Sequence, residues 1–236
     1  MQQHCIMPGQ GDKHRKGGMT YRMGNRKANR APRLSEVRRT AWYKNLKECY
    51  SRATQEAIEE GLVWYENANS FANQLATQYN LGPDTVAQII AALSPAAKWD
   101  RNLVDAENMV KAFYHRGYIG AKAVTVCTYG KNKEKALDIL CGKLQLTPKQ
   151  GLKTYNFWNN IHNPKERFFV TIDRHALRVL LGTGERGAVA IKPHQYAKAS
   201  LVYRVLADEL GLTPNQLQAI VWVQYRSELT SKGKAE

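Results

Sequence analysis

Residues 151–180 read GLKTYNFWNNIHNPKERFFVTIDRHALRVL, and this stretch decides how the chain is interpreted. A glycine opens it, and Lys153 follows two positions later. Gly151 and the preceding Pro148 predict a tight turn, and the pattern after them predicts a helix. An extended segment then leads to Asp173, directly before a second helix. The stretch therefore predicts that the Lys153 amine and the Asp173 carboxylate, at the two ends of this helix and extended segment, lie in one cleft.

The composition of the whole chain indicates a globular protein with a polyanionic partner. Its 236 residues are enough for a substantial core, and 43% of them are hydrophobic. The net charge is +15 and the isoelectric point is near 9.7. Nucleic acid is the simplest partner for such a charge, although an acidic membrane surface would fit the number alone. No apolar run approaches the roughly 18 residues of a membrane span, and no signal peptide opens the chain, so we expect a soluble, intracellular protein.

The first part of the chain differs in character from the rest. Residues 11–39 hold ten Lys and Arg against two acids, with Gly and Asn between them. We assign residues 1–34 to a basic, flexible arm and residues 35–236 to one helical domain. Such an arm is usually a solvated tail, and phosphate binding is the alternative.

The cysteines do not indicate a metal centre. Their spacings match neither a zinc site nor an iron–sulfur site, so we expect no metal and no cofactor. The four are Cys5, Cys49, Cys127 and Cys141.

Helical periodicity runs through nearly all of residues 35–236, which predicts an all-α fold. One helix is expected to begin near Gly61, and another spans residues 83–93 with Pro83 at its start. A third is expected from residue 94, with Ser94 as its N-cap. The only strand candidate is RFFVTI, residues 167–172, and a single strand makes no sheet.

The segment LTPKQGLKT, residues 146–154, predicts a hairpin turn between two short helices, within residues 140–162. The backbone N–H groups at the start of the second helix could bind a phosphate without reading a base. Lys153 would lie on the first turn of that helix. Other contacts to DNA are expected from Lys149, Gln150, Gly151 and Thr154.

TPKQGLKT and TIDRHALRV together resemble the core of the helix-hairpin-helix DNA glycosylase superfamily, which includes the endonuclease III-like and oxoguanine glycosylase-like enzymes. The family pattern is Leu-Pro-Gly-x-Gly-x-Lys-Thr-Ala, a helix and a loop, and then Val-Asp-Thr-His-x-x-Arg-Val. The resemblance covers roughly residues 85–182. The positions that match at the family spacing are Pro148, Gly151, Lys153, Thr154, Asp173, His175, Arg178 and Val179.

The chain also departs from the family pattern. Lys149 replaces the first hairpin glycine, and Arg174 replaces the threonine between the aspartate and the histidine. The cysteine quartet that holds an iron–sulfur cluster in endonuclease III is absent. VTIDRH and the later QAIVWVQYR, residues 218–226, are more loosely similar to uncharacterised proteins encoded in phage and bacterial genomes.

The resemblance implies catalytic roles for two residues. Asp173 would stabilise the positive charge that builds on deoxyribose as a base leaves, although it could also be simply the N-cap of the next helix. Lys153 would attack C1′ and form a Schiff base, which permits strand cleavage as an AP lyase. A plain phosphate contact is the alternative for Lys153, and both roles stay open.

Further positions follow from the same resemblance. Arg174 and His175 would contact DNA, and Ser94 and Lys98 match the region that enters the duplex. Trp99, Tyr155 and Trp222 are candidates for stacking on a flipped base, although aromatics at helical spacing more often belong to the core.

The sequence thus predicts a DNA glycosylase that flips out and excises a damaged or modified base, with AP-lyase activity as an open question. We expect double-stranded DNA as partner, no membrane, and a monomer. The base is not identified: oxidised, alkylated, deaminated, mismatched and hypermodified phage bases all fit, in DNA repair or in antiviral defence. The alternatives are a non-catalytic DNA-binding protein and a structure-specific nuclease. A nuclease usually needs clustered acids for magnesium, and no such cluster is apparent in the sequence.

Overall fold

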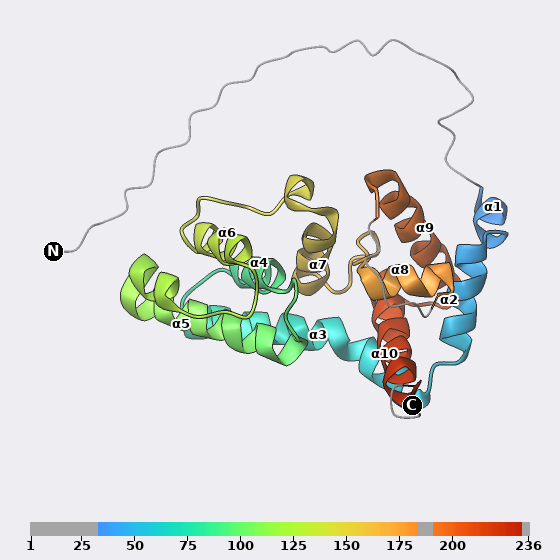
Figure 1. Ribbon diagram of the computed structural model, residues 1–236, viewed down its shortest axis with the longest axis horizontal. Coiled ribbons are helices and arrows are strands. Elements are labelled where there is room, and N and C mark those ends of the chain that lie inside the picture. The colour runs from blue at the N-terminus through green and yellow to red at the C-terminus, as the bar shows by residue number, and fades with distance from the viewer. Residues whose placement is uncertain (1–32, 184–190, 233–236) are drawn as a thin grey trace, which may run out of the picture. The chain divides into compact units, whose positions relative to one another are not determined.

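The computed structural model describes residues 33–183 and 191–232, and every regular element of secondary structure within these ranges is a helix (Figure 1). The prediction of an all-α fold is therefore confirmed. Most of the predicted arm, residues 1–32, lies outside the described residues, and helix α1 already begins at Leu34. The first six helices are α1 (Leu34–Arg38), α2 (Ala41–Ser51), α3 (Gln55–Gln78), α4 (Pro83–Leu93), α5 (Trp99–Ala123) and α6 (Gly130–Leu140). A 3-10 turn, η1 (Pro148–Gln150), precedes α7 (Leu152–His162), α8 (Arg174–Leu181), α9 (Pro193–Glu209) and α10 (Pro214–Lys232).

Two hydrophobic cores organise these helices. The first forms around α4, where Ile89, Ile90 and Leu93 are fully or almost fully buried, and α3, α5, α6 and α7 pack around it. The second forms where α8 packs among α2, α9 and α10, around Leu180 and Tyr203. The two sets of helices occupy the left and right of Figure 1, and α3 reaches from α10 to α4.

The connection between the two cores depends on one glycine. Gly61 lies inside α3, and a Cβ at this position would come within 2.5 Å of the backbone N and Cα of Ile220 in α10. The two helices therefore approach backbone to backbone. The expectation that a helix begins near Gly61 is wrong, because α3 begins at Gln55 and the glycine serves this contact.

The expectation that Ser94 is the N-cap of a helix is also wrong. Residues 94–98 form a turn instead, in which Ala96 has a left-handed φ of 66° that no α-helix contains. The Ser94 hydroxyl donates to the carbonyl of Ala91 at the end of α4, and α5 begins only at Trp99.

The hairpin of residues 140–162 is more open than predicted. Helix α6 ends at Leu140 and α7 begins at Leu152, so residues 141–151 separate them rather than a tight turn. The connection is fixed to α4, because the Leu146 backbone N–H donates to Gln88 Oε1 at 2.7 Å. Residues 167–172, the strand candidate, form no strand.

We expect Gly61→Ala to destabilise the protein by about 1–3 kcal/mol, because the added methyl group has to push α3 and α10 apart. Urea unfolding measures the change. Gly130→Ala is the matched control, since nothing lies within 4 Å of its Cβ position and it opens α6. Equal unfolding midpoints for the two variants would contradict the importance of the contact.

Candidate functional site

Asp173 lies at the N-cap of α8, where its Oδ1 accepts a hydrogen bond of 2.7 Å from the backbone N–H of Ala176. The predicted capping role is therefore confirmed. Its side chain is half-buried. Within the described ranges, no hydrogen-bond donor occupies its second oxygen, Oδ2. A capped carboxylate is held in one orientation, which leaves Oδ2 able to face a bound molecule.

Side chains from two helices hold the extended segment that leads to Asp173. Asn160 in α7 donates to the carbonyl of Phe169 at 2.9 Å and accepts from the Thr171 hydroxyl at 2.9 Å. On the other side, Tyr196 in α9 donates to the carbonyl of Val170 and accepts from the Ile172 N–H. These bonds satisfy buried backbone groups that no sheet satisfies, and they fix α8 relative to α7.

A buried phenol from α3 lies within electrostatic reach of the Asp173 carboxylate. Burial raises the pKa of Tyr65 well above its usual value, and the charge of Asp173 adds to this effect, although a hydrogen bond with Thr171 opposes it. The Tyr65 hydroxyl donates to Gln218 Oε1 in α10 at 2.7 Å. The Asp173 carboxylate at the start of α8 therefore lies within electrostatic reach of the contact between Tyr65 in α3 and Gln218 in α10.

Four aromatic side chains from four helices gather beside Tyr65. Trp64 is central: its ring centroid lies 4.5 Å from that of Trp99, 6.1 Å from that of Phe157 and 6.1 Å from that of Trp222. We call this set the aromatic cluster. Its three tryptophans are half-buried and Phe157 is buried, and the neighbouring Tyr65 packs edge-on against Trp64 at 4.7 Å. A partly open aromatic surface of this kind can accept a flat ring by stacking.

The structure thus brings together two of the three predicted stacking residues, Trp99 and Trp222. The third, Tyr155, lies elsewhere: its ring contacts Trp158 at 5.5 Å and Phe169 at 5.7 Å. The sequence interpretation missed Trp64 and Phe157. A signal existed for Phe157, because it lies one helical turn after Lys153 on the same face of α7.

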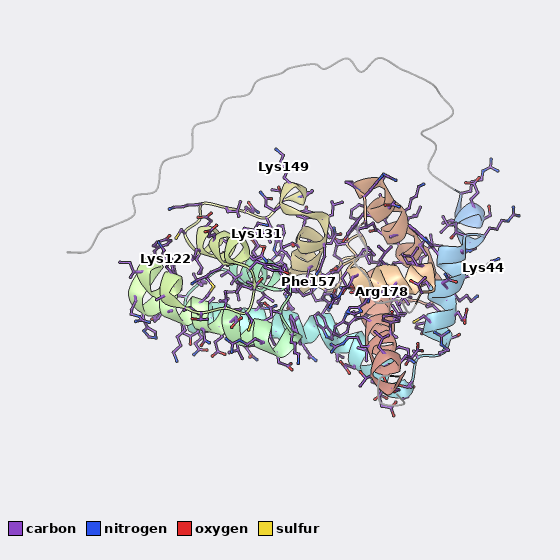
Figure 2. The ribbon with its side chains drawn as sticks, viewed as in Figure 1. Lys44, Lys122, Lys131, Lys149, Phe157 and Arg178 are labelled. Carbon is purple, nitrogen blue, oxygen red and sulfur yellow. The ribbon has the colours of Figure 1, made fainter. Side chains whose placement is uncertain are left out.

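One cation contacts the aromatic cluster, and two further arginines lie on α8. The guanidinium of Arg226 lies 4.6 Å from the centroid of the Trp222 ring, and Gln218, Trp222 and Arg226 follow one another along one face of α10. Arg174 is exposed at the start of α8. Arg178 is buried in the same helix, near the middle of Figure 2, where Phe157 is also labelled.

Lys153 is exposed on the first turn of α7, and no ion pair joins it to Asp173. Lys153 precedes Phe157 of the aromatic cluster by one helical turn, on the same face of α7. The Asn160 bonds join α7 to the segment before α8, and the convergence of Lys153 and Asp173 on one cleft stays a prediction. It is not a direct contact between the two side chains.

The other predicted contact residues of the hairpin lie around η1. Lys149 is exposed at its tip, as Figure 2 shows, and Thr154 is half-buried. Gln150 acts within the turn, because its Oε1 accepts from the backbone N–H of Thr147 at 2.8 Å. Gly151 has a φ of 118°, a conformation that disfavours any other residue. Before α5, Lys98 is exposed and directly precedes Trp99.

A protein-family model covers residues 28–229 of the chain. The protein belongs to this family, a family of unknown function designated DUF7178. No curated protein and no solved structure matches the chain. In the described part, no three His, Cys, Asp or Glu side chains are placed to hold a metal ion. None of the helices described is both long and apolar enough to cross a membrane.

His175 completes the site on α8. Its Nδ1 is buried without a hydrogen-bond partner among the described residues, and its ring lies 5.9 Å from that of Tyr225. Burial lowers the pKa of His175. The charge of Asp173 opposes this shift, whereas the charges of Arg174, Arg178 and Arg226 reinforce it. The imidazole is therefore held in its neutral form.

This shift predicts a pH-dependent stability. The folded protein binds a proton at His175 less readily than the unfolded chain does, so stability falls as pH decreases through the unfolded pKa near 6.5. We expect His175→Gln to lose less stability than wild type between about pH 7.5 and pH 5, as measured by urea unfolding. His194→Gln, at an exposed position of α9, controls for the loss of one histidine. Identical pH profiles for wild type and His175→Gln would refute the assignment.

Proposed function

We propose that this protein is a DNA glycosylase, which flips a damaged or modified base out of duplex DNA and breaks its N-glycosidic bond. The observation that carries the proposal is the half-buried, oriented carboxylate of Asp173 within electrostatic reach of Tyr65, whose ring packs against Trp64 of the partly buried aromatic cluster, in a chain of net charge +15. Base excision needs this combination: an aromatic receptor for the base and a fixed anion for the sugar.

Asp173 would act on the sugar. Cleavage of the bond between C1′ and the base nitrogen leaves positive charge spread over C1′ and the ring oxygen. A carboxylate held by the Ala176 N–H cannot turn away from that charge, and its partial burial strengthens the attraction. Its free oxygen, Oδ2, could also orient the attacking nucleophile.

The aromatic cluster would receive the base. Trp99 and Trp222 both contact Trp64, so a base that binds here has several rings on which to stack. Arg226 over Trp222 supplies hydrogen-bond donors at the edge of this surface. Which base fits depends on these side chains together.

Lys153 would add a lyase step. Its unprotonated amine attacks C1′ while the base departs with the bonding electron pair and takes a proton from solvent. The sugar opens to an imine, and loss of a proton from C2′ then expels the 3′ phosphate. The exposure of Lys153 on the first turn of α7, one turn from Phe157, suits an amine that has to reach the sugar.

A non-catalytic DNA-binding protein is the second candidate, and one observation favours it. Asp173 already has a structural role as the N-cap of α8, so its presence does not by itself require catalysis. The two candidates differ in their products: a glycosylase leaves abasic sites, whereas a binding protein leaves DNA unchanged.

We expect Asp173→Asn to abolish base release, by a factor on the order of 10²–10³, while affinity for DNA changes little. Asparagine caps a helix about as well as aspartate, so α8 remains and only the charge is lost. Duplexes with single defined lesions, together with phage DNA containing hypermodified bases, supply the substrates. Asp208→Asn, at an exposed position of α9, is the control for loss of one carboxylate. Excision at the wild-type rate by Asp173→Asn would end the assignment. Wild-type binding to the whole panel without base release would favour the second candidate.

The role of Lys153 is tested by trapping. We expect borohydride added during turnover to link wild type covalently to DNA, because reduction converts the imine into a stable amine. Both Lys153→Ala and Lys153→Arg should lose the adduct, since a guanidinium stays protonated and cannot attack. Lys149→Ala, at the neighbouring exposed lysine, should bind DNA more weakly but still form the covalent adduct. If wild type forms no adduct and Lys153→Arg still releases the base, Lys153 is not the nucleophile, and Asp173 directs a water molecule to C1′ instead.

A further inference from the structure

A shallow depression of about 360 Å³ lies on α5, beyond the aromatic cluster. One face of the helix and the chain that follows it form the walls, and no carboxylate is among the lining residues. All of the polar side chains among them can donate hydrogen bonds. The lining residues are Asn108, Lys111, Ala112, His115, Arg116, Val124 and Thr125.

The surroundings of the depression are strongly basic. Between residues 107 and 133 there are five Lys and Arg residues and one acid, Glu107. In the described ranges, none of these five cations forms a salt bridge. Structural ion pairing therefore does not account for them. They are Lys111, Arg116, Lys122, Lys131 and Lys133.

Large apolar side chains are exposed in the same segment. Tyr114, Tyr118 and Tyr129 are 57%, 44% and 62% exposed, and Ile119 is 81% exposed. The ammonium groups of Lys122 and Lys143 lie 5.6 and 5.9 Å from the Tyr118 ring centroid. Aromatic rings interleaved with cations are typical of surfaces that bind nucleic acid, since the cations attract phosphates and the rings stack on bases.

A break in α5 creates this arrangement. Gly117 has φ 59° and ψ −153°, so the helix stops there and the next turn folds back. Gly120 then packs so closely that a Cβ would lie 2.5 Å from the carbonyl oxygen of Ala112. This contact holds Tyr118 and Lys122 at the end of the straight part of the helix. We call residues 107–133 the elbow surface.

We propose that the elbow surface is a second nucleic-acid contact, which binds the phosphodiester backbone through Lys111, Arg116 and Lys122 and offers Tyr118 to an unstacked base. The inference goes beyond base excision, and DNA as the partner rests on the proposed function. An anionic membrane would also attract these cations. The depression, however, is lined by hydrogen-bond donors that suit phosphate oxygens, and Ile119 is the single exposed large aliphatic side chain of the segment.

The elbow surface stands apart from the candidate site on the same helix. Trp99 of the aromatic cluster and Lys111 are twelve positions apart in α5, or about 18 Å along the axis. Figure 1 shows the end of α5 at the side of the molecule away from α8, and Figure 2 labels Lys122 there.

The test compares two triple variants of the full chain. Lys111→Ala with Arg116→Ala and Lys122→Ala removes the elbow cations. The control variant combines Arg39→Ala, Lys44→Ala and Lys198→Ala, and so removes three exposed cations: one directly after α1, one in α2 and one in α9. Figure 2 places Lys44 at the opposite end of the molecule from Lys122. Fluorescence anisotropy over a salt series measures binding to a defined duplex and to its single strand. The elbow variant should bind at least about tenfold more weakly, and its log–log salt slope should fall by about 2 to 3, whereas the control stays close to wild type.

Each outcome decides the proposal. Loss of affinity in the elbow variant alone, with wild-type thermal unfolding, supports it, and loss confined to the single strand identifies unpaired nucleic acid as the ligand. Equal binding by both triple variants overturns it, even when base release is observed. Unchanged DNA binding with lost binding to anionic phospholipid vesicles overturns it in favour of a membrane. If wild type releases no base but the elbow variant still loses affinity for DNA, the glycosylase proposal is wrong and the elbow surface is still supported as a DNA contact.

Discussion

The close contact of Gly61 with the backbone of Ile220 is the constraint on which the rest of the structure depends. It brings α3 and α10 to a separation that no larger residue allows. One turn along α3, Tyr65 can then donate to Gln218, and its neighbour Trp64 can reach Trp222. The two hydrophobic cores are joined at this place, and the candidate site forms where they are joined.

The structural role of Asp173 is compatible with the chemistry proposed for it. Its carboxylate ends an extended segment whose backbone groups are satisfied by Asn160 and Tyr196, from helices on both sides. As an N-cap it stabilises α8 and is itself held still by the Ala176 N–H. A fixed carboxylate stabilises a developing positive charge better than a mobile one, because it needs no reorganisation when the charge appears. The structural role thus makes the proposed chemical role physically reasonable.

The predictions from sequence succeeded where local signals and long-range packing agree. Pro83 at the start of a run of apolar residues predicted α4, and Asp173 before RHALRVLL predicted its own capping role. They failed where packing overrides local preference. Ser94 and Pro95 have the residue types of a helix start, yet the left-handed Ala96 and a hydrogen bond from Thr128 to Pro95 make them a turn. Gly61 was interpreted as the start of a helix, because the sequence around a glycine does not show whether a distant helix packs against it.

The sequence by itself determined the all-α class, the basic character of the protein, and the two segments that contain Lys153 and Asp173. These depend on composition and on residues close together in the chain, where periodicity and capping act directly. Only the tertiary structure decided which aromatics form a cluster: Trp64, Trp99, Phe157 and Trp222 come from four helices, while Tyr155 packs elsewhere. The reason is physical. A helix has several faces, and the side that meets another helix is selected by close packing between residues distant in sequence, such as Gly61 and Ile220.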